Sequence, residues 1–581
     1  MTGAEHATLR DELDAAGVRR GTPVALVVAP GIGVALAWDG GSRSVAGDPA
    51  GVVAALEPLA PRWVWWSARV HAAPLVAAGV RPRACWDLAA VARLLHGIWR
   101  DDEGAVWAAH RGLPEPPHAL GELSLLDLAG EADDAVRPDG QLSREWLRGE
   151  WSRSLEHAST WARLALDVFA AQERDVRALP DHRAAPGASP LPYLVALSES
   201  MAALLCVELE HDGLPVDRAI LETMLTETVG PRPRSEAEEA EIRRARDGVV
   251  WDAFGGDVVD LRNPAVVRDL LARHGVDVPD TRSWRLEPYA TGSAGVSALL
   301  QWRKAERVAT TYGWTWVDRA VGADDRLRGV WGASEGAGRM TASAGLHNLP
   351  GELRPAIRPA PRRVLVRSDL GQIEPRVLAA VSGDARLAEA ARDDDMYAPV
   401  ARALGSDRPT AKVAVLAAMY GQTTGPAGEA LKDMERTYPA AITYLRDAED
   451  LGRRGVDLRT YGGRLLRLSS LHQPGADGEQ SSASAHGYGR FARNAVVQGA
   501  AAELFKAWAA TVRAGLTGTD ARIVLCLHDE LLVECAEADS DRVAAIVDDA
   551  LQSTAAWWCA GSGVRLVSDT TVAESWADAK G

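Results

Sequence analysis

Cysteine is scarce in this 581-residue chain, and no long apolar run opens it. Its five cysteines form no CxxC pair: Cys85, Cys206, Cys526, Cys535 and Cys559. That spacing argues against a disulfide framework or a structural zinc site and predicts a reducing cytoplasm. The N-terminal residues lack an apolar signal core, and no segment reads as long and apolar enough to span a membrane. We therefore expect a cytoplasmic protein with no membrane partner.

An excess of positive charge is also missing, since the formal net charge is −16. The chain is therefore not coated in basic surface, and any nucleic-acid binding must come from local arginine patches on an acidic body. Lysine is rare against a large excess of arginine: Lys304, Lys412, Lys432, Lys506 and Lys580. The length leaves room for three or four domains with sizeable cores.

One of these lysines lies in the stretch SDRPTAKVAVLAAMYG, residues 406–421. Arg408, Lys412 and Tyr420 follow a four-residue rhythm, which keeps side chains near one face of a helix. The expected boundary residues are an N-cap, a first-turn proline and a terminal glycine: Asp407, Pro409 and Gly421. Alone, this face reads as a solvated cationic surface. An ammonium can also bind phosphate and donate a proton.

Two apolar segments end in carboxylates. Residues 364–369 are predicted to form a strand that ends at Asp369. Residues 523–535 are predicted to form a hairpin with Asp529 and Glu530 at its tip. Each acid alone would more often be structural or solvated. Together, two strand-borne aspartates can hold two divalent cations about 4 Å apart. Oxygen ligands suit Mg²⁺, and a cationic helix face would neutralise the phosphates of a substrate.

Six motifs in order resemble those of the family A DNA polymerases, the bacterial DNA polymerase I group. They are Gly338-Arg339-Met340 with Leu346-His347-Asn348-Leu349-Pro350, Asp369-Leu-Gly-Gln-Ile-Glu374-Pro-Arg376, Arg408-x3-Lys412-x7-Tyr420-Gly421, Thr460-Tyr-Gly-Gly463-Arg464, Arg490-x3-Asn494-x3-Gln498-Gly499 and His528-Asp529-Glu530. The resemblance implies template-directed addition of deoxynucleotides to a primer 3′ end. It also implies two Mg²⁺ ions, with Mn²⁺ as a substitute, and primer–template DNA and dNTPs as partners.

The resemblance implies a role for each matched residue. Asp369 and Asp529 would bind the metals, with Glu530 beside them, and Lys412 could protonate the pyrophosphate leaving group. The nucleotide-binding residues would be Arg408, Lys412, Leu416, Tyr420, Glu374 and Gln372. The DNA-binding residues would be Arg339, Asn348, Arg490, Asn494, Gln498 and His528.

The implied fold class is an α+β multidomain chain. An RNase H-like 3′–5′ exonuclease-type domain (residues 1–185) would precede a right-hand polymerase with a thumb (193–320) and a palm with fingers (321–581, fingers about 390–480). A thumb-like region that begins near residue 193 leads us to expect no 5′-nuclease domain before it. The family default is a monomer, and its setting is the nucleoid in the cytoplasm.

The exonuclease-type domain is expected to be inactive. The family pattern needs four carboxylates, but the first strand, PVALVVAP, has no DxE. His71 stands where one aspartate is expected, and His157 and Trp161 stand in place of a tyrosine and an aspartate. Without those carboxylates no second metal site forms. A different alignment would make Asp87 or Asp167 a ligand.

Leu416 departs from the family pattern, which has Phe or Tyr four residues after the lysine. Because that ring normally packs on the incoming sugar, a sugar-tolerant or RNA-synthesising polymerase is an alternative. A non-catalytic relic that only binds DNA is another, although the retained aspartates argue against it.

Overall fold

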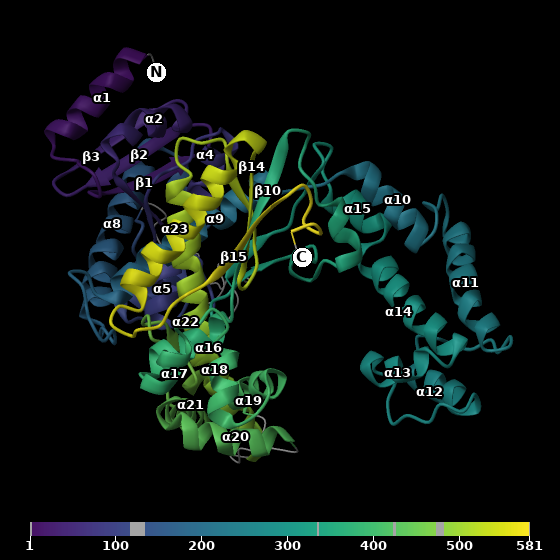
Figure 1. Cartoon of the computed structure of the whole chain (residues 1–581). Coiled ribbons are helices and arrows are strands. Elements are labelled where there is room, and N and C mark those ends of the chain that lie inside the picture. Colours follow the sequence, from purple (N-terminus) through teal and green to yellow (C-terminus); the bar gives the residue numbers. More distant parts are fainter. Residues whose placement is uncertain (1–2, 117–133, 334–335, 422–425, 472–481, 580–581) are drawn as a thin grey trace. The chain divides into compact units, whose positions relative to one another are not determined.

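The computed structural model describes residues 3–116, 134–333, 336–421, 426–471 and 482–579 (Figure 1). The chain forms two compact units. Unit 1 comprises residues 1–212, 331–341 and 366–572, and unit 2 comprises residues 213–330, 342–365 and 573–581. Both contain helices and strands, as the α+β class requires. The division at 1–185, 193–320 and 321–581 stays a prediction.

The first sheet of unit 1 has five strands in the order β3-β2-β1-β4-β5. Their bounds are β1 Pro23–Ala29, β2 Gly33–Trp38, β3 Gly41–Ala46, β4 Arg62–Trp65 and β5 Cys85–Asp87. The central strand β1 runs antiparallel to β2 and parallel to β4. Its sequence PVALVVA is apolar without alternation because both faces of the strand are buried.

Helices pack around this sheet, and α8 contacts β1, β2 and β3. Their bounds are α1 Gly3–Ala15, α2 Pro49–Leu56, α3 Ala68–His71, α4 Ala73–Ala77, α5 Leu88–His96, α6 Glu103–Arg111, α7 Arg144–Leu147 and α8 Leu155–Ala178. An aspartate or serine caps the N-terminus of several of them. Ser154, for example, accepts a hydrogen bond from the backbone of His157 at the start of α8.

Helix α9 (Leu191–Asp212) corrects one expectation from the sequence. By length and composition it is apolar enough to cross a membrane, and 78% of its most apolar window is buried inside the protein. It packs against β5, α5, α8 and α22. Its apolar residues therefore serve the interior of unit 1, as in the core helix of a globular protein.

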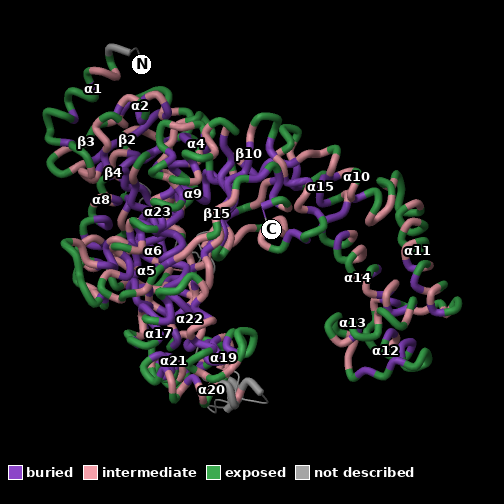
Figure 2. The backbone as a smooth tube through the Cα atoms, in the orientation of Figure 1, coloured by how far each residue is buried: buried purple, intermediate pink, exposed green. Residues whose placement is uncertain are grey.

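The second sheet has the order β13-β14-β10-β15. Its strands are β10 Arg363–Leu370, β13 Arg522–Cys526, β14 Glu530–Ala536 and β15 Ser568–Ala573. The helices of this part are α16 Ile373–Ser382, α17 Ala385–Ala390, α18 Tyr397–Leu404, α19 Arg408–Tyr420, α20 Pro426–Thr437, α21 Pro439–Arg453, α22 Ser482–Gly515 and α23 Ser540–Trp558. Short strand pairs are formed by β8 Trp331–Ala333 with β9 Met340–Ala342 and by β11 Leu458–Arg459 with β12 Leu465–Leu466. Most of β10 is buried (Figure 2).

Unit 2 is built mainly of helices. They are α10 Arg218–Thr228, α11 Glu236–Ala253, α12 Pro264–Arg273, α13 Ser283–Ala290, α14 Ala294–Tyr312 and α15 Trp314–Ala320, with the strand pair β6 Leu214–Pro215 and β7 Arg326–Leu327. Helix α11 is exposed over much of its length (Figure 2).

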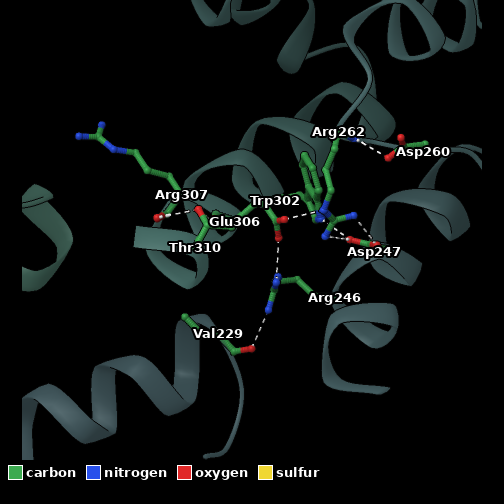
Figure 3. Close-up of polar contacts among 9 residues, drawn as sticks. All are labelled: Val229, Arg246, Asp247, Asp260, Arg262, Trp302, Glu306, Arg307 and Thr310. Atoms are coloured by element: carbon green, nitrogen blue, oxygen red, sulfur yellow. Dashed lines mark hydrogen bonds and ion pairs between the residues drawn. The ribbon is translucent and has the colours of Figure 1, made fainter. Parts of the chain in front are cut away.

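An ion-pair cluster joins α11 to α14 (Figure 3). Arg246 of α11 pairs with Glu306 of α14 at 2.8 Å. Arg262 pairs with the same Glu306 at 2.6 Å and with Asp247 at 2.8 Å. The indole of Trp302 also donates to Asp247 at 2.8 Å. Because each partly buried charge has an opposite partner, the cluster aligns the two long helices without leaving an unpaired charge.

Candidate active site

Asp369 and Asp529 are brought together by neighbouring strands. Asp369 is the penultimate residue of β10, and the next backbone N–H, of Leu370, donates to the carbonyl of Asp529 at 2.7 Å. The hairpin expected at 523–535 is present as β13 and β14, which pair antiparallel. Asp529 lies in its exposed turn, while Glu530 begins β14 and is buried. The three acids therefore lie at the same end of the neighbouring strands β10 and β14.

A buried arginine contacts these acids and was missed from the sequence. Arg367 donates through Nη2 to Oδ2 of Asp369 at 2.7 Å and pairs through Nε with Oε2 of Glu530 at 3.0 Å. The signal was visible as a single arginine in the apolar strand VLVRSD, two residues before the aspartate. Alternation along a strand puts residues i and i+2 on one face.

The donor set suits a hard divalent cation. Carboxylate oxygens are the ligands that Mg²⁺ prefers, and it usually completes its coordination with water and substrate phosphates. Within the described ranges, no group of three or more His, Cys, Asp or Glu side chains is arranged to hold a metal ion.

Helix α19 begins and ends where its sequence predicts. Asp407 accepts a hydrogen bond from the backbone of Thr410, and Gly421 closes the helix at φ 67°. Ala411, Ala414 and Ala418 bury one face. On the other face Arg408, Lys412 and Tyr420 are exposed, and Leu416 is half-buried.

Arg408 is held by an acid that the sequence did not single out. Its Nε donates to Oδ2 of Asp395 at 2.5 Å, and the amide of Gln372 donates to Oδ1 of Asp395 at 2.8 Å. The hydrogen bond from Arg408 lowers the pKa of Asp395. Gln372 adopts φ 57° at the N-cap of α16, a left-handed conformation that is strained for a residue other than glycine. Through Asp395, this turn is connected to Arg408 at the start of α19. Within the described residues Lys412 has no ion pair.

Glu374 connects the other end of α19 to a loop residue. The hydroxyl of Tyr420 donates to Oε2 of Glu374 at 3.1 Å, and Arg339 binds Oε1 of the same carboxylate. Burial raises the pKa of Tyr420, and the charge of Glu374 raises it further. A cavity of about 70 Å³ is lined by Arg339 and Glu374 together with His528 and Asp529. These four predicted residues therefore lie around one space.

Helix α22 presents Arg490, Asn494 and Gln498 at steps of four, with Arg490 exposed and the other two half-buried. The sequence missed the neighbouring Arg493, which is buried. Its Nε donates to the carbonyl of Ala418 in α19 at 2.8 Å, and its Nη1 donates to Glu449 in α21 at 2.9 Å. No local pattern indicates this role, because both partners lie far away in sequence.

One of the predicted DNA-binding residues, Asn348, belongs to the other unit. Asn348 is exposed and belongs to unit 2, where its carbonyl accepts a hydrogen bond from the hydroxyl of Tyr312 at 2.8 Å. Burial lowers the pKa of His528, and Arg339 lowers it further.

A cluster of buried charged side chains joins α22 to α9. Arg464 pairs with Glu199 of α9 at 2.7 Å, and Lys506 of α22 binds the other oxygen of Glu199. Glu503 accepts a hydrogen bond from the backbone of Gly462 at 3.0 Å. Burial raises the pKa of Glu503 and lowers that of Lys506. Burial alone would raise the pKa of Glu199, but Arg464 and Lys506 together lower it to about 2.

Aromatic rings surround the residues that stand where the resemblance predicts exonuclease carboxylates. The ring of Trp161 stacks on Trp66 at 4.7 Å between centroids, and Trp151 lies 5.3 Å from His71. Asp87 is also accounted for, since it caps α5 and accepts from the backbones of Ala68 and Ala90 at 2.6 and 2.8 Å.

His71 makes stability depend on pH. It is fully buried, its Nδ1 accepts from the backbone of Val28 at 3.3 Å, and burial lowers its pKa to about 3. Below about pH 6.5 the unfolded chain takes up a proton at this residue that the folded chain does not. We therefore expect the free energy of unfolding of wild type to fall by about 1.4 kcal/mol relative to that of His71→Asn between pH 7.5 and 5.5.

The measurement is urea unfolding of both proteins at the two pH values. The same substitution at the exposed His182 serves as the control for losing an imidazole. If the stability difference between wild type and His71→Asn stays constant over this range, His71 is not buried in its neutral form.

Comparisons with known proteins agree with the motifs. The sequence model of DNA polymerase family A matches residues 273–578, just over half of the chain. DNA polymerase I of Chloroflexus aurantiacus is 29% identical over 246 residues, which cover 37% of this chain and 25% of that protein. The thermostable DNA polymerase I of Thermus thermophilus is 26% identical over 557 residues, covering 89% of this chain and 61% of that protein.

A solved structure shows the same fold. It is the POL domain of Pol1 from M. smegmatis in complex with DNA primer-template and dNTP, with a TM-score of 0.65, 21% identity and coverage of 100% of this chain and 99% of that one. The chain spans about half the length of curated relatives such as DNA polymerase I of Mycobacterium tuberculosis, of which it covers 53%. On the match to residues 273–578, this chain belongs to DNA polymerase family A.

Proposed function

We propose that the chain is a template-directed DNA polymerase that adds deoxynucleotides to the 3′ end of a primer and does not proofread. The observation that carries the proposal is the meeting of Asp369 and Asp529 through the hydrogen bond from Leu370 N–H to the carbonyl of Asp529. Both acids lie within the residues matched to the family. The M. smegmatis polymerase domain is in complex with DNA primer-template and dNTP, and we propose the same two substrates for this chain.

The proposed reaction is attack of the primer 3′-OH on the α-phosphate of the incoming nucleotide. It forms a new phosphodiester bond, breaks the bond between the α- and β-phosphates, and releases pyrophosphate and the proton of the hydroxyl group. Two Mg²⁺ ions, when bound, supply activation of the hydroxyl and stabilisation of the developing charge. Asp369 and Asp529 would hold them. The exposed cations Arg408 and Lys412 would bind the triphosphate, and the Lys412 ammonium would give a proton to the pyrophosphate.

Glu374 and Tyr420 would border the sugar and the templating base. Their mutual hydrogen bond and the contact of Glu374 with Arg339 support a shaped wall there. Gln372 would act through Asp395 by orienting Arg408. Arg490, Asn494, Gln498, Asn348 and His528 would contact the DNA. Leu416, half-buried on the open face of α19, would lie nearest to the sugar.

The finer domain layout is part of this proposal. The five-stranded mixed sheet supports an RNase H-like, exonuclease-type domain. The tryptophan cluster around Trp161 and the capping role of Asp87 support its inactivity. Thumb, palm and fingers would follow as the sequence suggests. All five cysteines are free, which supports a reducing cytoplasm as the setting.

A primer-extension assay with the full chain tests the proposal. With a 5′-labelled primer, a template, Mg²⁺ and dNTPs, we expect stepwise extension to the template end. Parallel reactions with rNTPs and dideoxynucleotides measure the choice of sugar, and we expect rNTPs to be used much more slowly.

The same labelled primer without nucleotides tests for proofreading. We expect it to keep its length over a period in which most of it is extended when dNTPs are present. Shortening from the 3′ end would contradict the inactive exonuclease-type domain, and absence of extension would contradict the polymerase.

A further inference from the structure

We propose that Arg367 is a positioning residue of the candidate active site, which holds Asp369 and Glu530 in place and competes with a divalent cation for Asp369. The inference rests on the proposed function, because it takes Asp369 as a metal ligand. Beyond that function, the Arg367 guanidinium is assigned as a cation that binds the carboxylates of Asp369 and Glu530.

The geometry places Arg367 between the acids. It precedes Asp369 by two residues on β10, so both side chains leave the same face of the strand. Its side chain is only 7% exposed, and its nitrogens lie 2.7 Å from Oδ2 of Asp369 and 3.0 Å from Oε2 of Glu530. A third acid, Asp569 of β15, lies 3.7 Å away and is 79% exposed.

Burial explains why Glu530 needs this partner. Its side chain is 2% exposed, and a carboxylate that deep is costly without an opposite charge and hydrogen bonds. A guanidinium can bind two carboxylates at once because its donors lie in a fixed plane. Arg367 therefore fixes Glu530 relative to Asp369.

The same contact opposes metal binding. A Mg²⁺ ion lies about 2.0–2.1 Å from its oxygen ligands, so a guanidinium bonded to Oδ2 blocks that oxygen. A positive group at this distance also repels a dication. For the ion to use Oδ2 of Asp369, the Nη2 group of Arg367 has to leave that oxygen.

The test is Mn²⁺ binding to the full chain without DNA or nucleotide, followed by the electron paramagnetic resonance signal of free Mn²⁺. We expect Arg367→Met to bind Mn²⁺ at least tenfold more tightly than wild type, equal to about 1.4 kcal/mol. Arg367→Lys keeps the charge and should stay within about threefold of wild type. Arg522→Met, at the far end of β13 from Asp529, is the matched control and should change nothing.

Asp369→Asn separates failure of this inference from failure of the proposed function. If Asp369→Asn loses Mn²⁺ binding while Arg367→Met binds with unchanged or weaker affinity, Arg367 does not compete and the inference is wrong. If Asp369→Asn binds Mn²⁺ like wild type, the carboxylate site is wrong and both proposals are overturned.

Arg367→Met removes the cation that pairs with the buried Glu530, so a second variant guards against loss of folding. Arg367→Met with Glu530→Gln removes both charges of the buried pair and should also bind Mn²⁺ more tightly than Glu530→Gln alone. Thermal unfolding gives an independent readout, because Mn²⁺ should raise the Tm of the double variant more than that of Glu530→Gln. Equal shifts in these two proteins would count against the competition.

Discussion

Asp369→Asn and Asp529→Asn are each expected to slow primer extension by about a thousandfold or more, because the loss of one metal position removes about 4 kcal/mol of transition-state stabilisation. Asparagine keeps the size of the side chain but not its charge. Binding of primer–template DNA should stay within about threefold of wild type, since phosphate contacts made elsewhere supply most of that affinity. Single-turnover extension and a binding titration measure the two effects separately.

Asp569→Asn is the matched control for these variants. It is the same substitution on the neighbouring strand β15, at an exposed acid that lies 3.7 Å from Arg367. We expect it to extend primers within a few-fold of wild type. Extension by the Asp369 and Asp529 variants at that same level would show that the two aspartates do not perform the chemistry.

Glu199→Gln is expected to cost about 3–5 kcal/mol of stability, the largest effect on folding that we predict. Glu199 lies between Arg464 and Lys506, and all three side chains are no more than 6% exposed. Its removal leaves two buried cations without their shared carboxylate. Urea unfolding at pH 7.5 measures the loss.

Adding Lys506→Met to Glu199→Gln should restore part of the stability, because the second change removes one of the stranded cations. Glu173→Gln on α8 is the control, since its i,i+4 pair with Arg177 is partly exposed and is worth about 0.5 kcal/mol at most. A loss in Glu199→Gln no larger than in this control would mean that the cluster contributes little.

Local signals predicted much of the site. The cap at Asp407, the glycine at 421 and the four-residue rhythm of α19 are properties of one helix, and the structure has them as expected. The hairpin β13–β14 and the end of β10 follow likewise from short apolar patterns. Placing Asp369 beside Asp529 needed more, namely a resemblance between motifs about 160 residues apart.

The contacts that were missed all depend on tertiary packing. Arg493 reaches Ala418 across 75 positions, and Lys506 reaches Glu199 across about 300. Contacts between residues so far apart in the sequence produce no periodic pattern from which they could be predicted. Helix α9 shows that composition has a similar limit. A helix that is apolar all round can be buried in a protein core or in a membrane, so its composition alone does not tell the two apart.

The two ends of α19 differ in how salt acts on them. At its C-terminal end, Arg493 is buried and donates to the carbonyl of Ala418, so ions in solution hardly screen that attachment. At its N-terminal end, Arg408 is 54% exposed and its pair with Asp395 weakens as ionic strength rises. A helix of 13 residues is about 20 Å long, so a small tilt about the fixed end displaces Arg408 by several ångströms and Tyr420 by little. Rising ionic strength therefore loosens the N-terminal end of α19 more than its C-terminal end.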